Sequence, residues 1–405
     1  MHIPRSYDLL AFGQLMEDRQ MFFLSGPRQV GKTTSCRRLG GRVEASHYFD
    51  WEGRTDRAVI RGGAAALGEE IGMERLQDSS PLLILDEIHK FAGWKDMLKG
   101  LFDAYADQVK VIVTGSARMD VFKRGGDSLL GRYFPYRMHP LSVAELASVA
   151  VPDTEIRRPP KTPSPDDFRA LLEFGGFPEP YLRREKRFHR KWLRLRTGLL
   201  LKEDLRDLSR TTEVARIEVL AQLVAQRAGQ LTSYASLSKE LGVSIGTVKR
   251  WLTMLEALYY LFPVRPWYRN VARALRKEPK YYLWDWSALD NDGARLENLV
   301  ASALLKAVHF WSDTGMGDYA LHYIRDKEKR EVDFLVVRDN SPWFLVEVKK
   351  AAGARLSKDL FRFQEQTGAS LAFQVAADLD PVDADCFSIE RPTIVPMVSF
   401  LSQLV

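Results

Sequence analysis

The chain has little cysteine: Cys36 and Cys386 are the only two among its 405 residues. Two cysteines support neither a disulfide framework nor a thiolate zinc site. The sequence also lacks any apolar run near the ~20 residues that a membrane-spanning helix needs. Its first residues, MHIPRSYDLLAFGQ, lack the apolar core of a signal peptide. These absences predict a cytoplasmic, reducing compartment and no membrane partner.

The excess of positive charge is also small. A formal net charge of +6 and a pI of about 9.1 are compatible with a polyanionic partner such as nucleic acid, but they do not establish one. Hydrophobic residues make up 45% and charged residues 28%, which is typical of a folded chain and not of a disordered one. Because 405 residues exceed the usual size of one core, we expect about two to four domains.

A glycine-rich stretch, GPRQVGKTT, is the most informative part of the sequence. It follows a predicted buried strand, 21–25, and matches the pattern G-x-x-x-x-G-K-[ST] at every specified position. In such a loop, successive backbone N–H groups surround phosphates, and the following helix directs its positive end at the same charge. Lys32 would then reach the β- and γ-phosphates, and Thr33 would bind Mg²⁺. The alternative is a plain strand–turn–helix without a ligand. The loop residues predicted to contact ATP are Gly26, Pro27, Arg28, Gln29, Val30, Gly31, Lys32, Thr33 and Thr34.

Two carboxylates follow a second predicted strand, 82–85, in the stretch PLLILDEIHK. The carboxyl end of a parallel strand is where an α/β sheet presents its ligand site. Asp86 would therefore hold Mg²⁺ together with Thr33, and Glu87 would orient or activate the attacking water. The alternative is that both acids are solvated or cap the next helix.

Two further stretches could complete this site. The predicted strand VKVIVTGSAR ends in Thr114 and Ser116, which could sense the γ-phosphate, and Ser116 joins the predicted ATP contacts. The stretch GRYFPYRMHP supplies Arg132 and Arg137. We predict Arg132 as the arginine delivered to a γ-phosphate, with delivery across a subunit interface as one arrangement. A surface arginine is the alternative.

Together, GPRQVGKTT, LLILDEIHK, VTGSAR and GRYFPYRMHPLSVAEL resemble the AAA-type ATPase domain of a widespread prokaryotic family. Members of this family carry a C-terminal domain of uncharacterised role. The resemblance continues through GGFPEP, LGVSIGTVKRWLTMLEALYYL, EPKYYLWD, ARLENLVASAL and EVDFLVV…VEVKK, so it covers nearly the whole chain. It implies an AAA-like fold and ATP binding, and it leaves the cellular role open.

The composition changes after the predicted ATPase domain. The stretch VPDTEIRRPPKTPSP carries five prolines and reads as an exposed linker. The later stretch RREKRFHRKWLRLR, 183–196, holds eight Lys or Arg residues against one Glu. It is either a helix that contacts phosphates or a solvated helix whose buried stripe is Phe188, Trp192 and Leu195.

A helix-turn-helix pattern follows in LTSYASLSKELGVSIGTVKRWLTMLEALYYL. The first helix ends at Gly242, and Ser244 caps the second. The second helix is predicted to bury Ile245, Val248, Leu252 and Leu255. Two extended runs after it could form a basic wing, so the pattern indicates a winged helix. The alternative is a module that docks protein. The predicted DNA contacts are Thr247, Lys249, Arg250, Arg269 and Arg273.

The stretch EVDFLVVRDNSPWFLVEVKK predicts a hairpin of strands 332–337 and 343–348 around the turn RDNSP. Folding about Asn340 places Asp333 opposite Glu347, and the alternation of side chains puts Glu347 and Lys349 on one face. Two carboxylates can bind Mg²⁺, and a lysine beside them can position or help deprotonate a water for phosphodiester cleavage.

A fourth residue, Glu297, borders the apolar stripe of the predicted helix ARLENLVASALLKAV and could face the same group. A helix acid, a strand Asp and Glu-x-Lys resemble the PD-(D/E)XK nucleases, although Val332 stands where that pattern has proline. The resemblance implies catalytic roles for Glu297, Asp333, Glu347 and Lys349, with Asp333 and Glu347 as metal ligands. The alternative is an ordinary hairpin face with charges of both signs.

These observations predict an α/β protein of four parts. An AAA-like P-loop domain with a parallel sheet (1–147) is followed by a Pro-rich linker and helical lid region (148–212), a winged-helix domain (213–280) and a restriction-nuclease-like α/β domain (281–405). One hypothesis is a Mg²⁺-dependent ATPase that forms homo-oligomers and couples hydrolysis to the remodelling or processing of double-stranded or branched DNA. The other hypothesis is a nucleotide-dependent switch that acts on protein partners and retains an inactive nuclease-like domain.

Overall fold

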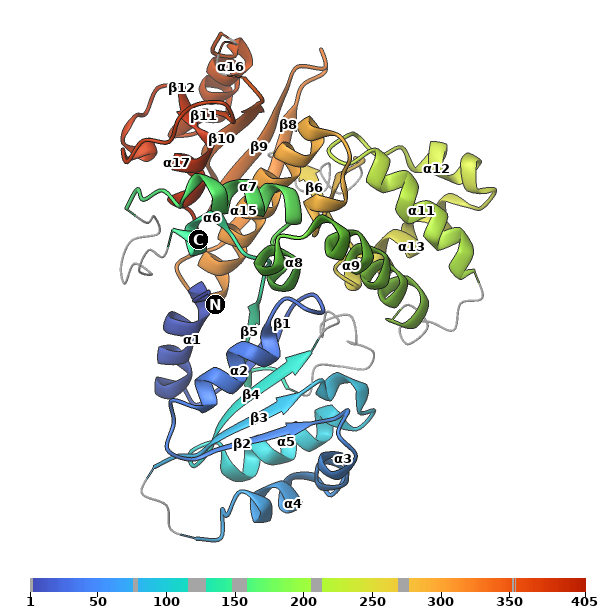
Figure 1. Cartoon of the computed structure of the whole chain (residues 1–405), viewed down its shortest axis with the longest axis vertical. Helices are drawn as coiled ribbons and strands as arrows, with labels where there is room; N and C mark the ends of the chain where they lie inside the picture. Colours follow the sequence, from blue (N-terminus) through green and yellow to red (C-terminus); the bar gives the residue numbers. More distant parts are fainter. Residues whose placement is uncertain are drawn as a thin grey trace. The chain divides into compact units, whose positions relative to one another are not determined.

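The computed structural model describes residues 3–75, 79–115, 129–147, 159–204, 213–268, 277–351, 353 and 355–405. These residues form two compact units, Pro4–His139 and Pro140–Val405 (Figure 1). In the part of the chain so described, no helix combines the length and the apolar character needed to cross a membrane.

The unit Pro4–His139 is built on a parallel sheet with the strand order β2-β3-β4-β1-β5. Parallel strands with helices on both faces need apolar side chains on both sides, and the buried runs MFFL and LLIL meet this need. The parallel α/β architecture predicted for this part of the chain is confirmed. The strands are β1 (Met21–Ser25), β2 (Ser46–Asp50), β3 (Leu82–Asp86), β4 (Lys110–Gly115) and β5 (Tyr133–Arg137). The helices are α1 (Ser6–Glu17), α2 (Lys32–Gly40), α3 (Arg54–Arg61), α4 (Gly63–Glu70), the short 3-10 helix η1 (Ile88–Lys90) and α5 (Trp94–Tyr105).

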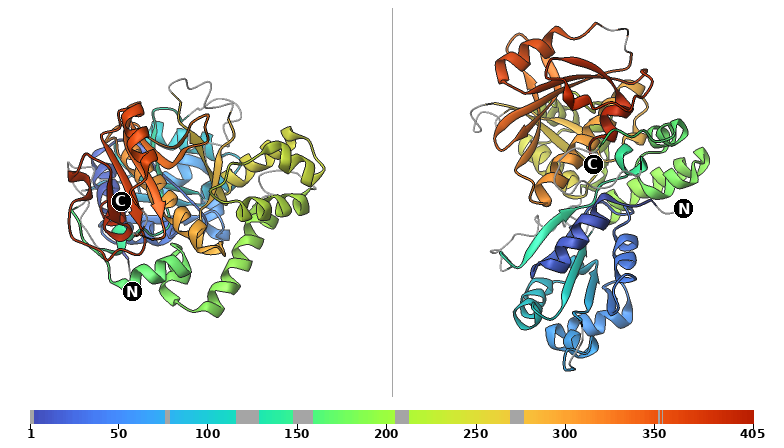
Figure 2. Two further views of the ribbon diagram at one scale, coloured as in Figure 1. Left: turned by 90° about the horizontal axis from the view of Figure 1, so that it is seen from above. Right: turned by 90° about the vertical axis from the view of Figure 1, so that its left-hand side faces the viewer.

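The unit Pro140–Val405 contains a mixed sheet with the strand order β12-β11-β10-β9-β8-β6-β7. The strands from β8 to β12, coloured orange to red, form one layer in Figures 1 and 2. The predicted hairpin is present, with Asp339 and Asn340 in left-handed conformation at its turn. The strands are β6 (Leu261–Pro266), β7 (Lys280–Leu283), β8 (Tyr319–Arg325), β9 (Glu331–Arg338), β10 (Ser341–Lys349), β11 (Leu371–Ala376) and β12 (Thr393–Pro396).

The helices of this unit fall into three groups along the chain. The first group comprises α6 (Val143–Leu146), α7 (Pro165–Phe174), α8 (Pro178–Arg183), α9 (Lys186–Leu199) and the π-helical turn η3 (Leu200–Asp204). The second comprises α11 (Val214–Gln226), α12 (Tyr234–Leu241) and α13 (Ile245–Ala257). The third comprises η4 (Trp286–Ala288), α15 (Asp292–Asp313), α16 (Lys358–Thr367), η5 (Cys386–Ser388) and α17 (Met397–Ser402).

Helices α11, α12 and α13 share a core with η3, β6 and β7, and its largest buried side chain is Trp251. Strands β6 and β7 follow as an antiparallel pair, and β6 also pairs with β8 in parallel at Arg265 and Pro266. The pair β6–β7 therefore extends the sheet of the C-terminal part. The three helices and the strand pair have the order expected of a winged helix, which stays a prediction. Most of the predicted linker lies outside the described residues.

Candidate functional site

The loop between β1 and α2 has positive φ angles at Gly26 and Gly31, which glycine adopts readily. Gly26 has φ of 155°, and a Cβ atom there would lie 2.4 Å from the carbonyl oxygen of Met138, so no other residue fits without a shift. Gly31 is left-handed, with φ of 107°, and precedes the first helical residue, Lys32. The loop therefore turns directly into the N-terminus of α2, where a phosphate would meet free backbone N–H groups.

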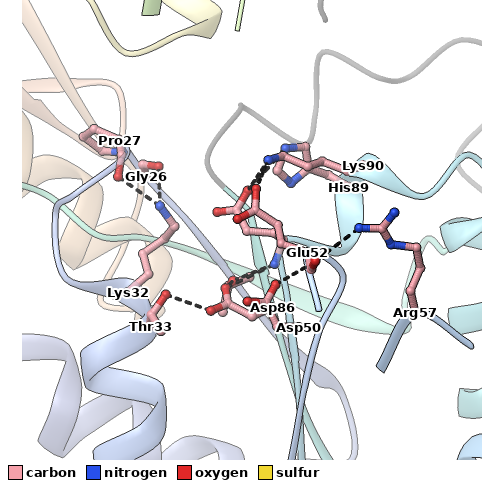
Figure 3. Close-up of polar contacts among 12 residues, drawn as sticks. Gly26, Pro27, Lys32, Thr33, Asp50, Glu52, Arg57, Asp86, His89 and Lys90 are labelled. Carbon is pink, nitrogen blue, oxygen red and sulfur yellow. Dashed lines mark hydrogen bonds and ion pairs between the residues drawn. The ribbon is translucent and has the colours of Figure 1, made fainter. Parts of the chain in front are cut away.

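Lys32 is held inside this loop. Its Nζ donates hydrogen bonds to the carbonyl oxygens of Gly26 and Pro27, both at 2.9 Å (Figure 3). Burial lowers the pKa of Lys32, against the opposing effect of Glu87 and Asp86. An ammonium bound only to two carbonyls can exchange these weak partners for phosphate oxygens, which carry full charge.

Asp86, the last residue of β3, accepts three hydroxyl groups. Thr33 Oγ1 donates to Asp86 Oδ2 at 2.7 Å, Tyr48 donates to the same oxygen, and Thr114 donates to Oδ1. Burial alone would raise the pKa of Asp86, but these three hydroxyls and Lys32 together lower it below its ordinary value. Asp86 is therefore an anion beside the Thr33 hydroxyl, which is the pair of oxygen donors that a Mg²⁺ ion on a bound nucleotide would use. The predicted pair, Thr33 and Asp86, therefore offers the kind of oxygen ligands that Mg²⁺ binds.

Glu87 follows in a strained backbone conformation, with φ of 51°. Its N–H donates to Asp86 Oδ1 at 3.1 Å, and its Oε2 lies 3.7 Å from Nε2 of His89. Lys90 lies 4.0 Å from Glu87 Oε2 and binds Glu52 (Figure 3).

Of three other predicted contributors, Thr114, Ser116 and Arg132, two lie among the described residues, and both differ from expectation. Thr114 is fully buried and donates to Asp86, so it supports a carboxylate instead of facing a phosphate. Ser116 lies outside the described residues. Arg132 lies next to the start of β1, since its carbonyl accepts the N–H of Met21, and its Nε pairs with Asp103 at 2.9 Å.

The phosphate loop leaves the opposite end of β1, where Ser25 pairs with Arg137. Five residues of strand separate the two ends, which is about 16 Å. Arg132 therefore does not reach the nucleotide of its own chain, and the predicted finger could act only at the site of another subunit.

One residue that holds the phosphate loop in place, Arg5, was not predicted. Arg5 is buried, and its guanidinium donates to the carbonyl of Val30 at 2.9 Å and to the carbonyl of His139. It thus ties the phosphate loop to the end of the N-terminal unit. No local motif marks Arg5, because its partners lie far along the chain.

The predicted recognition helix, α13, exposes its basic residues. Ser244 caps it as predicted, accepting the N–H of Thr247 at 3.1 Å. Lys249 and Arg250 are exposed, and Thr247 is half-buried. The predicted buried stripe is correct for the positions from Val248 onward but wrong for Ile245, which is 45% exposed because the first turn extends beyond the core. Arg269 and Arg273 lie outside the described residues.

In helix α9 the predicted buried stripe is correct for Trp192 and wrong for Leu195, and the predicted contact with phosphates stays a prediction. Trp192 is buried, but Leu195 is 68% exposed, and Arg196 is buried in its place with its guanidinium 4.0 Å from the Phe177 ring. The exposed face carries basic residues at helical spacing, namely Arg187, Arg190, Lys191 and Arg194.

The predicted nuclease-like residues lie together. Strands β9 and β10 pair with Val346 opposite Phe334, so Asp333 and Glu347 occupy the next position of the hairpin. Asp333 Oδ2 accepts the N–H of Val348 at 2.8 Å, and Lys349 Nζ binds Glu347 Oε1 at 2.6 Å.

Burial raises the pKa of two of these carboxyls. The pKa of Asp333 rises to about 7, with the charge of Glu297 as the second cause, and burial raises the pKa of Glu297 on α15 as well. Burial would lower the pKa of Lys349, but Glu347 beside it raises that pKa.

Three neighbours of this group were not predicted: Lys280, Tyr282 and Glu331. The hydroxyl of Tyr282 donates to Glu297 Oε1 at 2.7 Å, and Lys280 Nζ lies 2.5 Å from Glu331 Oε1. Among the residues that the structure describes, no three His, Cys, Asp or Glu side chains are arranged to hold a metal ion. Each of the two carboxylates predicted to bind a metal, Asp333 and Glu347, has one oxygen in contact with a protein donor.

Comparison with known proteins matches the chain in three segments. Residues 18–147 match a family described as an AAA domain. Residues 165–291 and 292–391 match two families described as domains of unknown function, DUF8612 and DUF4143.

Two relatives match most of the chain. An uncharacterized protein of Mycobacterium tuberculosis is 25% identical over 344 residues, covering 83% of this chain and 72% of the relative. An uncharacterized protein of Methanocaldococcus jannaschii is 22% identical over 402 residues, covering 90% of this chain and 82% of the relative.

Two solved structures are also similar. A Walker-type ATPase of Pyrococcus abyssi is 17% identical with a TM-score of 0.44, covering 70% of this chain and 94% of its own. AMPPCP-bound DnaA of Aquifex aeolicus is 14% identical with a TM-score of 0.33, covering 63% and 89%. The family match, together with the geometry of the phosphate loop and its parallel sheet, identifies residues 18–147 as a P-loop domain of the AAA type.

Proposed function

We propose that the chain hydrolyses ATP at the phosphate loop in a Mg²⁺-dependent reaction. The observation that carries this proposal is the 2.7 Å contact between Thr33 Oγ1 and Asp86 Oδ2, beside a buried Lys32. Lys32 binds the β- and γ-phosphates, and Thr33 and Asp86 hold the ion. Bound Mg²⁺ would neutralise the charge that develops on the phosphates. Glu87 orients and activates the attacking water.

The test is steady-state ATP hydrolysis by the wild type, Lys32→Ala and a control, Lys99→Ala, which changes an exposed lysine on α5 of the same unit. We expect Lys32→Ala to lose at least about a hundredfold in turnover, because it removes the cation that binds the transferred phosphoryl group. The control keeps the wild-type rate. Equal rates in wild type and Lys32→Ala would show that the activity does not arise at this loop.

We further propose that hydrolysis is coupled to the binding of double-stranded or branched DNA. Exposed Lys249 and Arg250 on the capped helix α13 support this proposal, as does the exposed basic face of α9. Basic side chains on one helix face contact phosphates without the need for a deep pocket. The distance of Arg132 from its own nucleotide supports homo-oligomers, because an arginine finger would then come from a neighbour.

The salt dependence of the DNA affinity tests whether α13 contacts the phosphates. Removal of a phosphate contact lowers the slope of log affinity against log salt by about 0.9. Lys249→Ala/Arg250→Ala should therefore lower the slope by about 1 to 2. Lys358→Ala/Arg362→Ala, two exposed basic residues on α16, should leave it unchanged. Equal slopes for both double variants would exclude α13 as the contact.

A nucleotide-dependent switch that acts on protein partners remains the second candidate. The observation that favours it is Lys280 among the nuclease-like carboxylates, since an inactive nuclease-like domain belongs to that candidate. It predicts slow ATPase activity, nucleotide-dependent oligomerisation and no DNA affinity near physiological salt. Gel shifts across salt concentrations, with and without ATP, distinguish the two.

A further inference from the structure

Lys280, the first residue of β7, points its ammonium group into the nuclease-like carboxylates. Its Nζ lies 2.5 Å from Glu331 Oε1, 3.9 Å from Glu297 Oε1 and 4.0 Å from Asp333 Oδ1. The side chain of Lys280 is only 5% exposed. One buried cation thus lies within 4.0 Å of carboxylates from α15 and β9.

The four carboxylates also have other donors within the protein. Each of them has at least one oxygen in contact with a hydroxyl, an N–H, an ammonium or a guanidinium group. These pairs are Tyr282 with Glu297, the Val348 N–H with Asp333, Arg325 with Glu331, and Lys349 with Glu347. One oxygen, Glu347 Oε2, is buried without a hydrogen-bond partner among the described residues. The carboxylates thus already accept from protein donors, whereas a Mg²⁺ site needs near-octahedral oxygen ligands.

We propose that Lys280 is the built-in counter-ion of this carboxylate group and takes the place of the divalent metal that a PD-(D/E)XK centre would use. The group then holds β7 to α15 and β9 as a structural ion cluster, and it does not cleave DNA. This inference does not depend on the proposed ATPase or on DNA binding.

Distance and charge place Lys280 in competition with a metal for the same carboxylates. An ion that bridged Glu297 and Asp333 would have to lie about 2 Å from an oxygen of each, which is the distance that Mg²⁺ requires. Those oxygens are already within about 4 Å of Lys280 Nζ, so the ion would share them with an ammonium group of the protein. The buried carboxylates therefore already have a cation of the chain itself to offset their charge.

The sheet topology explains why Lys280 lies beside these carboxylates. Strand β7 pairs with β6, with Lys280 opposite Val264, and β6 pairs with β8 of the C-terminal sheet. Lys280 belongs to the segment 165–291, whereas the carboxylates belong to the segment 292–391, which match different families. The ion cluster therefore lies where these two segments join.

The test compares thermal unfolding of the full chain without nucleotide, in EDTA and in MnCl2. We expect the wild-type midpoint to be the same in both. Lys280→Met should lower the midpoint by about 5 °C or more, because it leaves buried carboxylates without their cation. Adding Asp333→Asn to Lys280→Met should recover part of the loss. Lys277→Met, three residues earlier and exposed, is the matched control and should leave the midpoint unchanged.

A rise of the wild-type midpoint in MnCl2 that disappears in Asp333→Asn would overturn the proposal. So would Mn²⁺-dependent DNA cleavage that is lost in Asp333→Asn but kept in Lys32→Ala. These two measurements need only the wild type and variants that keep Lys280, so they decide the question even if Lys280→Met does not fold. A Lys280→Met midpoint equal to that of Lys277→Met would also contradict it.

Discussion

At the scale of single residues, Arg5 shows how the phosphate loop depends on a distant side chain. Its guanidinium binds the carbonyl of Val30, which lies inside the loop, 25 positions along the chain. This bond fixes the loop in the conformation that receives phosphate. Preorganisation of this kind lowers the free energy lost on binding, because the loop is ordered in advance.

Replacement of Arg5 should therefore weaken ATP binding more than catalysis. We expect Arg5→Ala to raise KM for ATP about tenfold, since a hydrogen bond from a charged donor contributes about 1.5–3 kcal/mol. The measurement is kcat and KM for ATP, with Arg42→Ala, an exposed arginine after α2, as control. An unchanged KM with a lower kcat would contradict the role of Arg5 in supporting the loop.

Glu87 is the second residue whose proposed role, the activation of water, can be tested by a single substitution. Glu87→Gln keeps the size of the side chain but removes its charge, so it should retain nucleotide binding and lower turnover about a hundredfold. Fluorescent-nucleotide titration and single-turnover hydrolysis separate the two effects. The exposed Glu44→Gln provides the control. Turnover equal to that of the wild type would exclude Glu87 as the residue that activates water.

At the scale of elements, α6 and α15 are joined by a buried ion pair. Lys306 Nζ lies 2.6 Å from Glu145 Oε2, and the two side chains are 2% and 1% exposed. Lys306 also donates to Ser142 Oγ at 3.1 Å, so the ammonium is well solvated by protein oxygens. Neither residue was predicted, because an apolar helix with one lysine usually directs that lysine to solvent.

Replacing one partner of this ion pair should lower the stability of the fold more than replacing both partners. We expect Glu145→Gln to lower the free energy of unfolding by about 3–5 kcal/mol, because the Lys306 charge stays buried. The double variant Glu145→Leu/Lys306→Met should cost less than either of its single changes, Glu145→Leu or Lys306→Met, because it leaves no buried charge unpaired. Urea unfolding of the full chain measures all variants. A double variant whose loss equals the sum of the two single losses would show that the side chains act independently.

The elements that could be predicted from sequence are those with local signals. The phosphate loop is encoded in nine consecutive residues, and the β9–β10 hairpin is encoded in its turn and its alternating pattern. The strands are longer than predicted, reaching Glu331 and Lys349, because Glu331 pairs with Arg325 of β8 and Lys349 pairs with Ala376 of β11.

The side chains that could not be predicted depend on strand order. Lys280 meets Asp333 only because β6 bridges β7 and β8, and Arg132 is far from its own phosphate loop because β5 lies beside β1 in parallel. No local pattern encodes which strands become neighbours. The same holds for Arg5 and Tyr48, whose partners are distant in sequence.

At the scale of the whole molecule, the proposed chemistry and the proposed DNA contacts belong to different units. The phosphate loop lies in Pro4–His139, whereas α9, α13 and the carboxylate cluster lie in Pro140–Val405. A protein that couples ATP hydrolysis to DNA must transmit binding from one unit to the other. Such coupling is reciprocal for binding, so DNA and ATP should each raise the affinity for the other.

The most direct measurement is ATP hydrolysis at physiological salt with and without duplexes, forks and junctions. The account predicts that at least one of these DNA forms raises the rate of the wild type, and that Lys32→Ala shows no turnover with any of them. An identical wild-type rate with every DNA form and without DNA would contradict the coupling of ATP hydrolysis to DNA.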